Sequence, residues 1–501
     1  MPDPASRTIG DLAPDVRSGA ISSVEVVRAV LERIERLEPT LRTYVTYDPV
    51  AALAAAGEAD REIDAGGWRG PLHGMPVAIK DCIAAAGWPT TNASPLMAAN
   101  LTTEDATVVR RLRDAGAIVV GKSNLHEWAM GGTCTGMPAG TVRNPWDPTR
   151  VPGGSSGGSA AAVSAGLALG AVGTDGMGSV RTPASYCGIV GLKPTPGLVS
   201  RRGELPANTS LNGTIGPLGR DVRDVAILLA AIAGHDPADP SSRRAPEGWR
   251  IDPEALRPDA AGLRVGLPRG YFLDEATAAV RGAIEATAAV LTSLGASVRE
   301  VELPSMRHVG LTLSGLHSET QPFLLPLALD HPDGFASRDI RNRILANEFV
   351  RLADARRALR LRDRIRKEVA HVMTDLDLLL TATNSTPPFP IGAETVAIGT
   401  GRETVALSAR GGQSRITTRL TIPFNVVGLP AMSLPARELA DGMPIGVQLV
   451  ASEWQEPLLL TAALALEAAT SGGHREPPLV REPDGMRGRD LAPIAALGAT
   501  R

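Results

Sequence analysis

The chain has 501 residues, of which 43% are hydrophobic and 21% charged, so it can bury the core of one large domain or of two to three ordinary ones. Its net charge is -3 and it contains no long run of like charges, which argues against nucleic acid or an anionic membrane surface as a partner. The sequence opens without a signal-peptide pattern and lacks the ~18 uninterrupted apolar residues of a membrane span, so we expect a cytoplasmic protein that does not bind membranes.

Two helices are predicted at the start of the chain. Ser22 and Glu25 match a capping box, and apolar residues then recur at helical spacing as far as Leu37. An alanine-rich helical run over residues 51–63 ends at a pair of glycines, the usual stop signal. We expect residues 1–66 to form a helical arm.

After residue 70 the sequence becomes rich in Gly, Pro, Ser and Thr, with short apolar runs suited to buried strands. Runs at 76–79 and 117–120 flank a helical pattern over 106–115, which indicates an α/β unit. The alternation continues with helices predicted at 222–233, 276–294 and 343–373 and strands at 263–267, 297–301 and 375–381. We therefore expect an α/β fold with a large, mixed, mostly parallel β-sheet covered by helices on both faces.

The densest chemical signal is the Gly-Gly-Ser-Ser-Gly-Gly-Ser segment over 153–159, which leads into a helix of small residues. A flexible linker is disfavoured, because linkers do not run directly into an apolar helical pattern. The G-x-S-x-G elbow of α/β-hydrolases needs a preceding strand, yet three prolines lie in the ten residues before the segment. A phosphate-binding P-loop would need a lysine that the segment lacks. We expect an ordered loop that opens a helix.

Several ordered motifs together resemble those of the amidase signature family. The resemblance covers about residues 10–470, and its motifs lie at 72–81, 121–124, 152–159, 173–181, 191–195, 428–431 and 444–448. It implies the amidase signature fold, with similarity to bacterial aryl-acyl amidases and urethanases. It also implies hydrolysis of C-N bonds by a lysine and two serines.

Carried over by motif, the catalytic triad falls on Lys80, Ser155 and Ser179. The resemblance makes Ser179 the nucleophile and Ser155 the bridging serine, whose peptide bond is cis in the family. Lys80 is the base, which a serine hydroxyl needs before it can attack a carbonyl. The lysine works as a base only when neutral, so burial must lower its pKa from the usual ~10.4.

The oxyanion hole is assigned to backbone N-H groups just before the nucleophile. Gly176, Met177 and Gly178 are the candidates, together with the nucleophile's own N-H. The family usually has two adjacent glycines here, so Met177 departs from the pattern and adds a side chain beside the pocket. Asp175 and Arg181 are expected to form an ion pair that orders the turn.

Three side chains are assigned to substrate binding. Trp128 and Met130 lie where the family often lines its pocket, with a core or lid role as the alternative. Thr174 precedes the nucleophile motif, with bracing of the loop as the alternative. His73 and His126 are expected to be structural hydrogen-bond partners.

The cysteines and histidines give no support for a metal site or a disulfide framework. Cys82, Cys134 and Cys187 form no C-x-x-C pair, and the 8 histidines lack metal-ligand spacing. We expect reduced thiols, no metal and no cofactor. Cys82 and Cys187 are interpreted as packing residues.

Several functions are considered. The leading hypothesis is a free-standing hydrolase that forms an acyl-enzyme on Ser179 and cleaves small-molecule amides, with carbamates (urethanes) or esters as further substrates. The alternatives are a promiscuous esterase or the A subunit of a glutamine amidotransferase for misacylated tRNA, although the tyrosine-rich helix expected of that subunit reads FVRLADAR over 349–356. A catalytically idle scaffold is disfavoured because all three triad positions are filled.

We expect a single amidase domain over residues 1–501, and a homodimer is a reasonable default. After the helical arm come a signature core at about 70–220 and a variable substrate-pocket region at about 300–345. Residues 477–501 are expected to form a surface tail.

Overall fold

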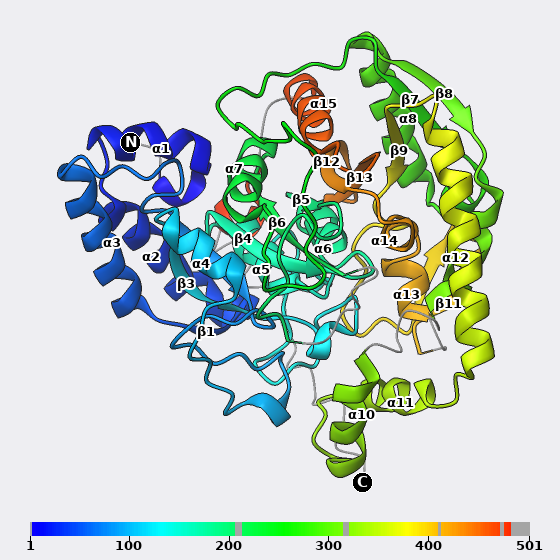
Figure 1. The fold of residues 1–501 in the computed structure, drawn as a ribbon, viewed down its shortest axis with the longest axis horizontal. Coiled ribbons are helices and arrows are strands. Elements are labelled where there is room, and N and C mark those ends of the chain that lie inside the picture. The colour runs from blue at the N-terminus through cyan, green and yellow to red at the C-terminus, as the bar shows by residue number, and fades with distance from the viewer. Residues whose placement is uncertain (1–2, 206–212, 314–319, 409–411, 471–474, 482–501) are drawn as a thin grey trace.

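One 11-stranded sheet runs through the computed structural model, which describes residues 3–205, 213–313, 320–408, 412–470 and 475–481 (Figure 1). Its strands are β1 (Tyr44–Tyr47), β2 (Pro76–Lys80), β3 (Ile118–Ser123), β4 (Gly170–Asp175), β5 (Val190–Lys193), β6 (Thr214–Gly219), β7 (Arg264–Pro268), β8 (Ser297–Val301), β9 (Leu378–Ala382), β12 (Ala431–Ala440) and β13 (Met443–Ala451). They lie in the order β1-β3-β2-β4-β6-β5-β12-β13-β9-β7-β8. A separate hairpin pairs β10 (Thr395–Ile398) with β11 (Glu403–Ala406).

The expected α/β fold with a large mixed sheet is confirmed, but parallel pairing is less extensive than we expected. Among the described strands of this sheet, four neighbouring pairs are parallel, in the blocks β3-β2-β4 and β9-β7-β8, and the other six are antiparallel. The centre of the sheet is antiparallel in part because β12 and β13 form a hairpin. Its turn residues Asp441 and Gly442 both have positive φ, as a tight hairpin turn requires.

The helices of the structure are α1 (Ile9–Ser18), α2 (Ser23–Leu41), α3 (Pro49–Asp64), α4 (Thr107–Asp114), α5 (Gly157–Ala165), α6 (Arg181–Cys187), α7 (Val222–Ile232), α8 (Ala278–Ser293), α10 (Gln321–Asp330), α11 (Arg338–Asn347), α12 (Leu352–Met373), α13 (Gly412–Thr417), α14 (Ile422–Val427), α15 (Glu456–Ala469) and α16 (Pro478–Arg481). Short 3-10 helices are η1 (Pro4–Ser6), η2 (Pro95–Met97), η3 (Glu127–Ala129), η4 (Gly270–Phe272) and η5 (Pro304–Thr312). The predicted capping box of Ser22 and Glu25 opens α2.

The helix predicted over 343–373 is wrong as a single element, because the chain breaks it into α11 and α12. The two parts pack against different partners. Helix α11 pairs with α10, whereas α12 lies along η5 and α14 (Figure 1). Tertiary packing therefore overrides a helical pattern that continues through the break.

Helices cover both faces of the central strands. Every residue of β2, β4, β6 and β9 is buried, which requires cover on both sides. A Cβ placed on Gly170 of β4 would meet Leu228 of α7, while one on Gly173 would meet Ser156 at the start of α5. Helices α5 and α7 thus lie on opposite faces of β4, the strand that leads to Ser179.

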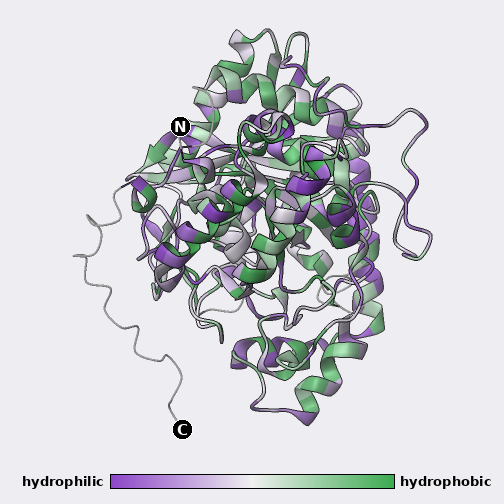
Figure 2. Cartoon of the chain, turned by 90° about the vertical axis from the view of Figure 1, so that its left-hand side faces the viewer, coloured by the Kyte–Doolittle hydropathy of each residue, from purple (hydrophilic) through white to green (hydrophobic). Residues whose placement is uncertain are grey.

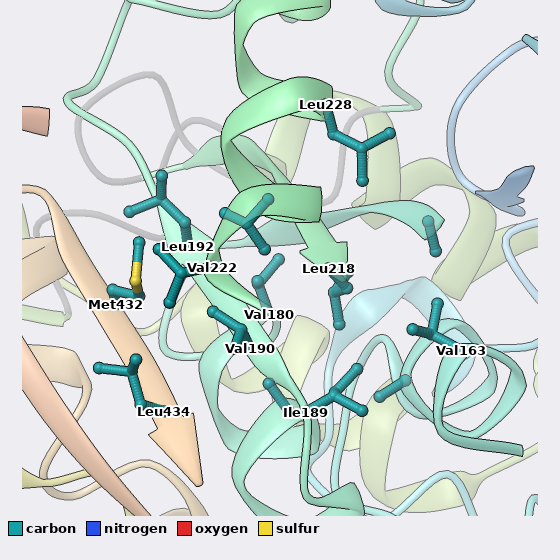
Figure 3. Close-up of a cluster of buried hydrophobic side chains, with 14 of the residues drawn as sticks. Val163, Val180, Ile189, Val190, Leu192, Leu218, Val222, Leu228, Met432 and Leu434 are labelled. Atoms are coloured by element: carbon teal, nitrogen blue, oxygen red, sulfur yellow. The ribbon is translucent and has the colours of Figure 1, made fainter. Parts of the chain in front are cut away.

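Apolar side chains from strands and helices meet in the core beside β5, β6 and β12. Figure 3 shows them converging from both kinds of element. The labelled residues, all buried, are Val163, Val180, Ile189, Val190, Leu192, Leu218, Val222, Leu228, Met432 and Leu434. Burial of this size holds the elements on each side of the predicted active site in fixed positions.

Hydrophilic and hydrophobic residues alternate along the helices at the surface, as expected of helices that pack on one side only (Figure 2). No helix among the described residues is both long and apolar enough to cross a membrane. Residues 482–501 of the predicted tail, and 314–319 of the predicted variable region, lie outside the described residues.

Candidate active site

Lys80 ends β2, a strand that lies between β3 and β4 in the sheet, and its side chain has no exposed surface. Its Nζ lies 2.7 Å from Ser155 Oγ and 2.7 Å from Thr174 Oγ1. Burial lowers the pKa of Lys80, and the nearby Cys82 and Cys134 oppose this effect. The lysine therefore has the two properties that a base needs here, contact with a hydroxyl and a weakened hold on its proton.

Ser155 lies in the glycine-rich turn that leads into α5, and the peptide bond between Gly154 and Ser155 is cis. Little space is left for a side chain at the glycine before it, because a Cβ on Gly154 would lie 3.0 Å from the carbonyl oxygen of Gly131. The carbonyl oxygen of Ser155 accepts hydrogen bonds from the His126 N-H (3.1 Å) and from the Cys134 thiol (3.3 Å). The turn is thus ordered, as predicted, and is held by a second loop.

Ser179 lies between β4 and α6 and is 8% exposed, whereas Ser155 and Lys80 are fully buried. The Ser156 N-H donates to the carbonyl oxygen of Ser179 (3.2 Å), which ties the two serine segments together through the backbone. Within the described part of the chain, no hydrogen bond joins Ser155 Oγ to Ser179 Oγ. Such contacts are often loose without substrate and tighten in the complex.

The predicted ion pair of Asp175 and Arg181 is confirmed and fully buried. Arg181 donates to both carboxylate oxygens, over 3.0 and 2.9 Å, and its remaining N-H groups reach Asn425 and Gln448. Burial raises the pKa of Asp175, but the Arg181 charge and the hydrogen bonds from Arg181 and Asn425 outweigh it and hold the pKa below its usual range. The carboxylate therefore stays charged and fixes the start of α6.

One predicted oxyanion donor is already engaged. The Gly178 N-H donates to Asp175 Oδ1 over 2.8 Å, so this N-H supports the turn instead of facing a substrate. The N-H groups of Met177 and Ser179 donate to no acceptor among the described residues and fit the oxyanion role better. Met177 is held by its carbonyl oxygen, which accepts from Thr421 Oγ1 (2.7 Å), and its side chain is partly exposed.

The residues assigned to substrate binding occupy different places. Thr174 is fully buried and accepts a hydrogen bond from Lys80, so it supports the lysine, which is close to the bracing alternative. Trp128 is also fully buried and packs against Phe323 of α10, as its core alternative requires. Met130 is partly exposed, and its carbonyl oxygen accepts from Arg343 of α11.

Sequence reasoning missed a tether between this region and α11. The buried carboxylate of Glu127 accepts hydrogen bonds from Ser94 Oγ (2.8 Å) and from the N-H groups of Ala336 (3.0 Å) and Ser337 (3.3 Å). Burial raises the pKa of Glu127, and these donors oppose the rise. The sequence around Glu127, Leu-His-Glu-Trp-Ala over 125–129, gives no pattern that indicates this tether.

His126 and His73 are hydrogen-bond partners, as predicted. His126 Nδ1 accepts from the Cys134 N-H (3.1 Å), and burial lowers the pKa of His126 to about 3, so the ring stays neutral. His73 Nε2 lies 3.1 Å from Glu62. The buried thiols of Cys82 and Cys187 have raised pKa values because of their burial, about 11 for Cys82, which agrees with packing roles.

No group of three or more His, Cys, Asp or Glu side chains in the described ranges is arranged to hold a metal ion. The site contains instead a buried lysine, two serines and backbone donors. The profile of the Amidase family matches residues 25–460. This chain belongs to the amidase family.

Relatives of this amidase-family chain carry different names. The A subunit of glutamyl-tRNA(Gln) amidotransferase from Chloroflexus aurantiacus is 38% identical over 487 residues, which cover 92% of this chain and 96% of the relative. Among solved structures, an inhibitor-bound complex described as a vestigial protein complex that reveals the origins of an s-triazine catabolic enzyme matches with a TM-score of 0.86 and 31% identity over 93% of this chain and 99% of the other. The peptide amidase of Stenotrophomonas maltophilia matches with a TM-score of 0.79 and 32% identity over 94% and 98%.

Proposed function

We propose that this amidase-family chain hydrolyses the C-N bond of a carboxamide through an acyl-enzyme on Ser179. The observation that carries the proposal is the contact between the buried Lys80 Nζ and Ser155 Oγ, since a lysine with a lowered pKa and a hydroxyl partner can draw a proton away from a neighbouring serine. The family match and the similarity to a peptide amidase support the same chemistry.

The proposed reaction starts when Ser179 Oγ attacks the carbonyl carbon and its proton passes through Ser155 to neutral Lys80. The N-H groups of Met177 and Ser179 stabilise the negative charge that develops on the carbonyl oxygen. Ser155 then delivers the proton to the leaving nitrogen as the C-N bond breaks. Water repeats the sequence on the acyl-enzyme and releases the acid.

A second candidate is supported by the names of the relatives. The 38% identity to the A subunit of an amidotransferase extends over nearly the whole of both chains, which favours this alternative over a free-standing hydrolase. In that role the same chemistry would release ammonia from glutamine for use by a partner protein. Against it, the segment over 349–356 lacks the tyrosines that we expect in such a protein.

The two candidates differ in what happens to the released nitrogen. A free-standing hydrolase releases an amine into solution, whereas an amidotransferase subunit passes ammonia to a partner protein, and one experiment separates the two. The products measured are the arylamine released from an aryl amide and from an N-aryl carbamate, the phenol released from an aryl ester with the same acyl group as the amide, and the ammonia released from glutamine, each with wild type and with Ser179→Ala. Turnover of the aryl panel that is lost in the variant supports a free-standing hydrolase and ranks amidase, urethanase and esterase activity. Ammonia release from glutamine that requires added amidotransferase partners supports the amidotransferase role instead, and no release under either condition contradicts both.

A further inference from the structure

The thiol of Cys134 lies inside the turn that carries Ser155. A Cβ placed on Gly154 would lie 3.1 Å from Cys134 Sγ, and one on Gly157 would lie 2.7 Å from it. The sulfur thus fills the space that these two glycines leave open, on both sides of Ser155. Cys134 itself has a positive φ of 52° and no exposed surface, so its backbone is held in an unusual conformation to place the thiol there.

The thiol and a neighbouring N-H hold the carbonyl oxygen of Ser155. Cys134 Sγ donates to this oxygen over 3.3 Å, and the His126 N-H donates to it over 3.1 Å. The His126 ring in turn accepts the Cys134 N-H at Nδ1 over 3.1 Å. Cys134 and His126 therefore contact each other and both donate to the carbonyl oxygen of Ser155, the residue predicted to relay the proton.

The protonation states suit this arrangement over a wide range of pH. Burial raises the pKa of the Cys134 thiol to about 12, against an opposing contribution from the Gly157 N-H, so the thiol keeps the proton that it donates. Burial also lowers the pKa of His126 to about 3, which keeps the ring nitrogen free to accept. A buried thiol that acts as a hydrogen-bond donor is unreactive, which separates this role from that of a nucleophile.

From these contacts we infer that Cys134 and His126 are positioning residues that fix the orientation of Ser155 between Ser179 and Lys80. The inference deepens the proposed function and rests on it, because Ser155 is the proton relay only in that mechanism. Both side chains are buried, with Cys134 0% and His126 7% exposed. Their effect is on how well Ser155 passes the Ser179 proton to Lys80 and then delivers a proton to a leaving nitrogen.

This role predicts a specific kinetic signature. An amide nitrogen must receive a proton from Ser155 before it leaves, whereas a nitrophenolate leaves an ester without one. A displaced Ser155 therefore slows amide hydrolysis more than ester hydrolysis of the same acyl group. General loss of folded protein would lower both rates equally and leave their ratio unchanged.

The test compares two variants. Cys134→Ala removes the hydrogen-bond donor to the Ser155 carbonyl oxygen, and Cys134→Ser replaces the thiol donor with a hydroxyl donor at the same place. Each variant is assayed with a p-nitroanilide and a p-nitrophenyl ester of one acyl group. We expect the amide-to-ester rate ratio to fall on the order of tenfold in Cys134→Ala and to recover in large part in Cys134→Ser. An unchanged ratio in a folded Cys134→Ala variant would overturn the inference.

Cys187→Ala is the matched control, since it also removes a buried thiol. The Cys187 thiol donates a hydrogen bond to the carbonyl oxygen of Pro152 and not to that of Ser155. Cys187→Ala should lower the free energy of unfolding and leave the amide-to-ester rate ratio unchanged. If Cys134→Ala does not fold, His126→Asn supplies the second variant, because it shortens the side chain that accepts the Cys134 N-H. A His126→Asn ratio equal to that of wild type then contradicts the inference.

The rate at which phenylmethanesulfonyl fluoride labels Ser179 gives a readout that does not depend on a substrate. Slower labelling of Cys134→Ala, restored in Cys134→Ser, supports the inference even when the proposed function fails because wild type cleaves no member of the panel. Equal labelling of all three proteins overturns it, whatever the panel shows.

Discussion

Lys80 Nζ lies as close to Thr174 Oγ1 as to Ser155 Oγ, 2.7 Å in each case. The register of β2 against β4 creates this arrangement, because Ile79 pairs with Val172 and the ends of the two strands then lie side by side. The Thr174 hydroxyl fixes the position of the Lys80 amine, so that Nζ stays within hydrogen-bond distance of Ser155 Oγ. Thr174 thus helps to hold the lysine that we propose as the base.

We predict that Thr174→Val lowers kcat/KM by about tenfold, because valine keeps the shape and removes the hydroxyl from a buried amine. Steady-state kinetics on the amide that wild type prefers provides the measurement. Thr174→Ser is the control and should stay close to wild type. Equal activity of the valine and serine variants would show that the hydroxyl has no part in holding Lys80.

Ser179→Ala should reduce amide turnover by at least about 10⁴-fold, because the mechanism places the acyl group on this hydroxyl alone. Mass spectrometry after mixing with a slowly deacylating ester checks the same point. A covalent adduct on wild type and none on the variant is the expected result. An adduct that persists in Ser179→Ala would assign the nucleophile to a different residue.

The pH dependence of turnover should follow the deprotonation of Lys80. Burial lowers its pKa from the ordinary 10.5, so the neutral, active form accumulates as pH rises and does so below pH 10.5. We expect kcat/KM to increase through this range and then level off, in a profile measured with one stable amide. A profile that falls as pH rises through the same window would contradict a lysine base.

The same shift affects stability with a definite sign. Below pH 10.5 the unfolded chain protonates Lys80 while the folded chain resists protonation, so the unfolded state binds more protons and the free energy of unfolding rises with pH. Lys80→Met should reduce this slope. Urea unfolding of both proteins at several pH values measures it, and identical slopes would mean that Lys80 titrates alike in both states.

Asp175→Asn should lower the free energy of unfolding by about 3–5 kcal/mol, because it leaves the buried Arg181 charge without its partner. Denaturant titration gives this value. Asp354→Asn is a matched control at the exposed pair with Arg351 and should leave stability almost unchanged. Similar losses in the two variants would show that burial does not set the strength of the Asp175 pair.

Gly178→Ala tests the space beside the nucleophile. The added Cβ would lie 2.0 Å from Thr421 Oγ1 at a φ of +120°, so we expect ~1–3 kcal/mol of overpacking in addition to backbone strain, together with reduced turnover. Gly66→Ala is the control, because Gly66 has a φ of +83° and a Cβ there would meet no atom within 4 Å. This variant should lower the free energy of unfolding only by the backbone cost of about 1–2 kcal/mol. Thermal unfolding compares the two, and equal losses would exclude crowding at Gly178.

The sequence allows prediction of features that depend on local patterns. The apolar run before Lys80 indicates a buried strand, and β2 is buried at all five positions. The glycine-serine segment before α5 indicates an ordered turn, because its small residues lead straight into a helix. In both cases the signal lies beside the side chain that it positions.

Contacts that depend on the meeting of distant segments could not be predicted in this way. The role of Thr174 depends on strand register, and that of Cys134 depends on a loop that folds under the Ser155 turn. The engagement of the Gly178 N-H by Asp175 depends on the exact path of a tight turn. None of these leaves a periodic or compositional trace in the sequence.

The brace around Arg181 also bears on how the protein is synthesised. Lys80, Ser155 and Ser179 all emerge from the ribosome well before the C-terminal third of the chain, yet the guanidinium that orders the nucleophile turn is held by Asn425 and Gln448. A nascent chain therefore carries its complete set of reactive groups long before the partners of Arg181 exist. We expect the turn before α6 to reach its final order only after the strand containing Gln448 has been translated and has joined the sheet.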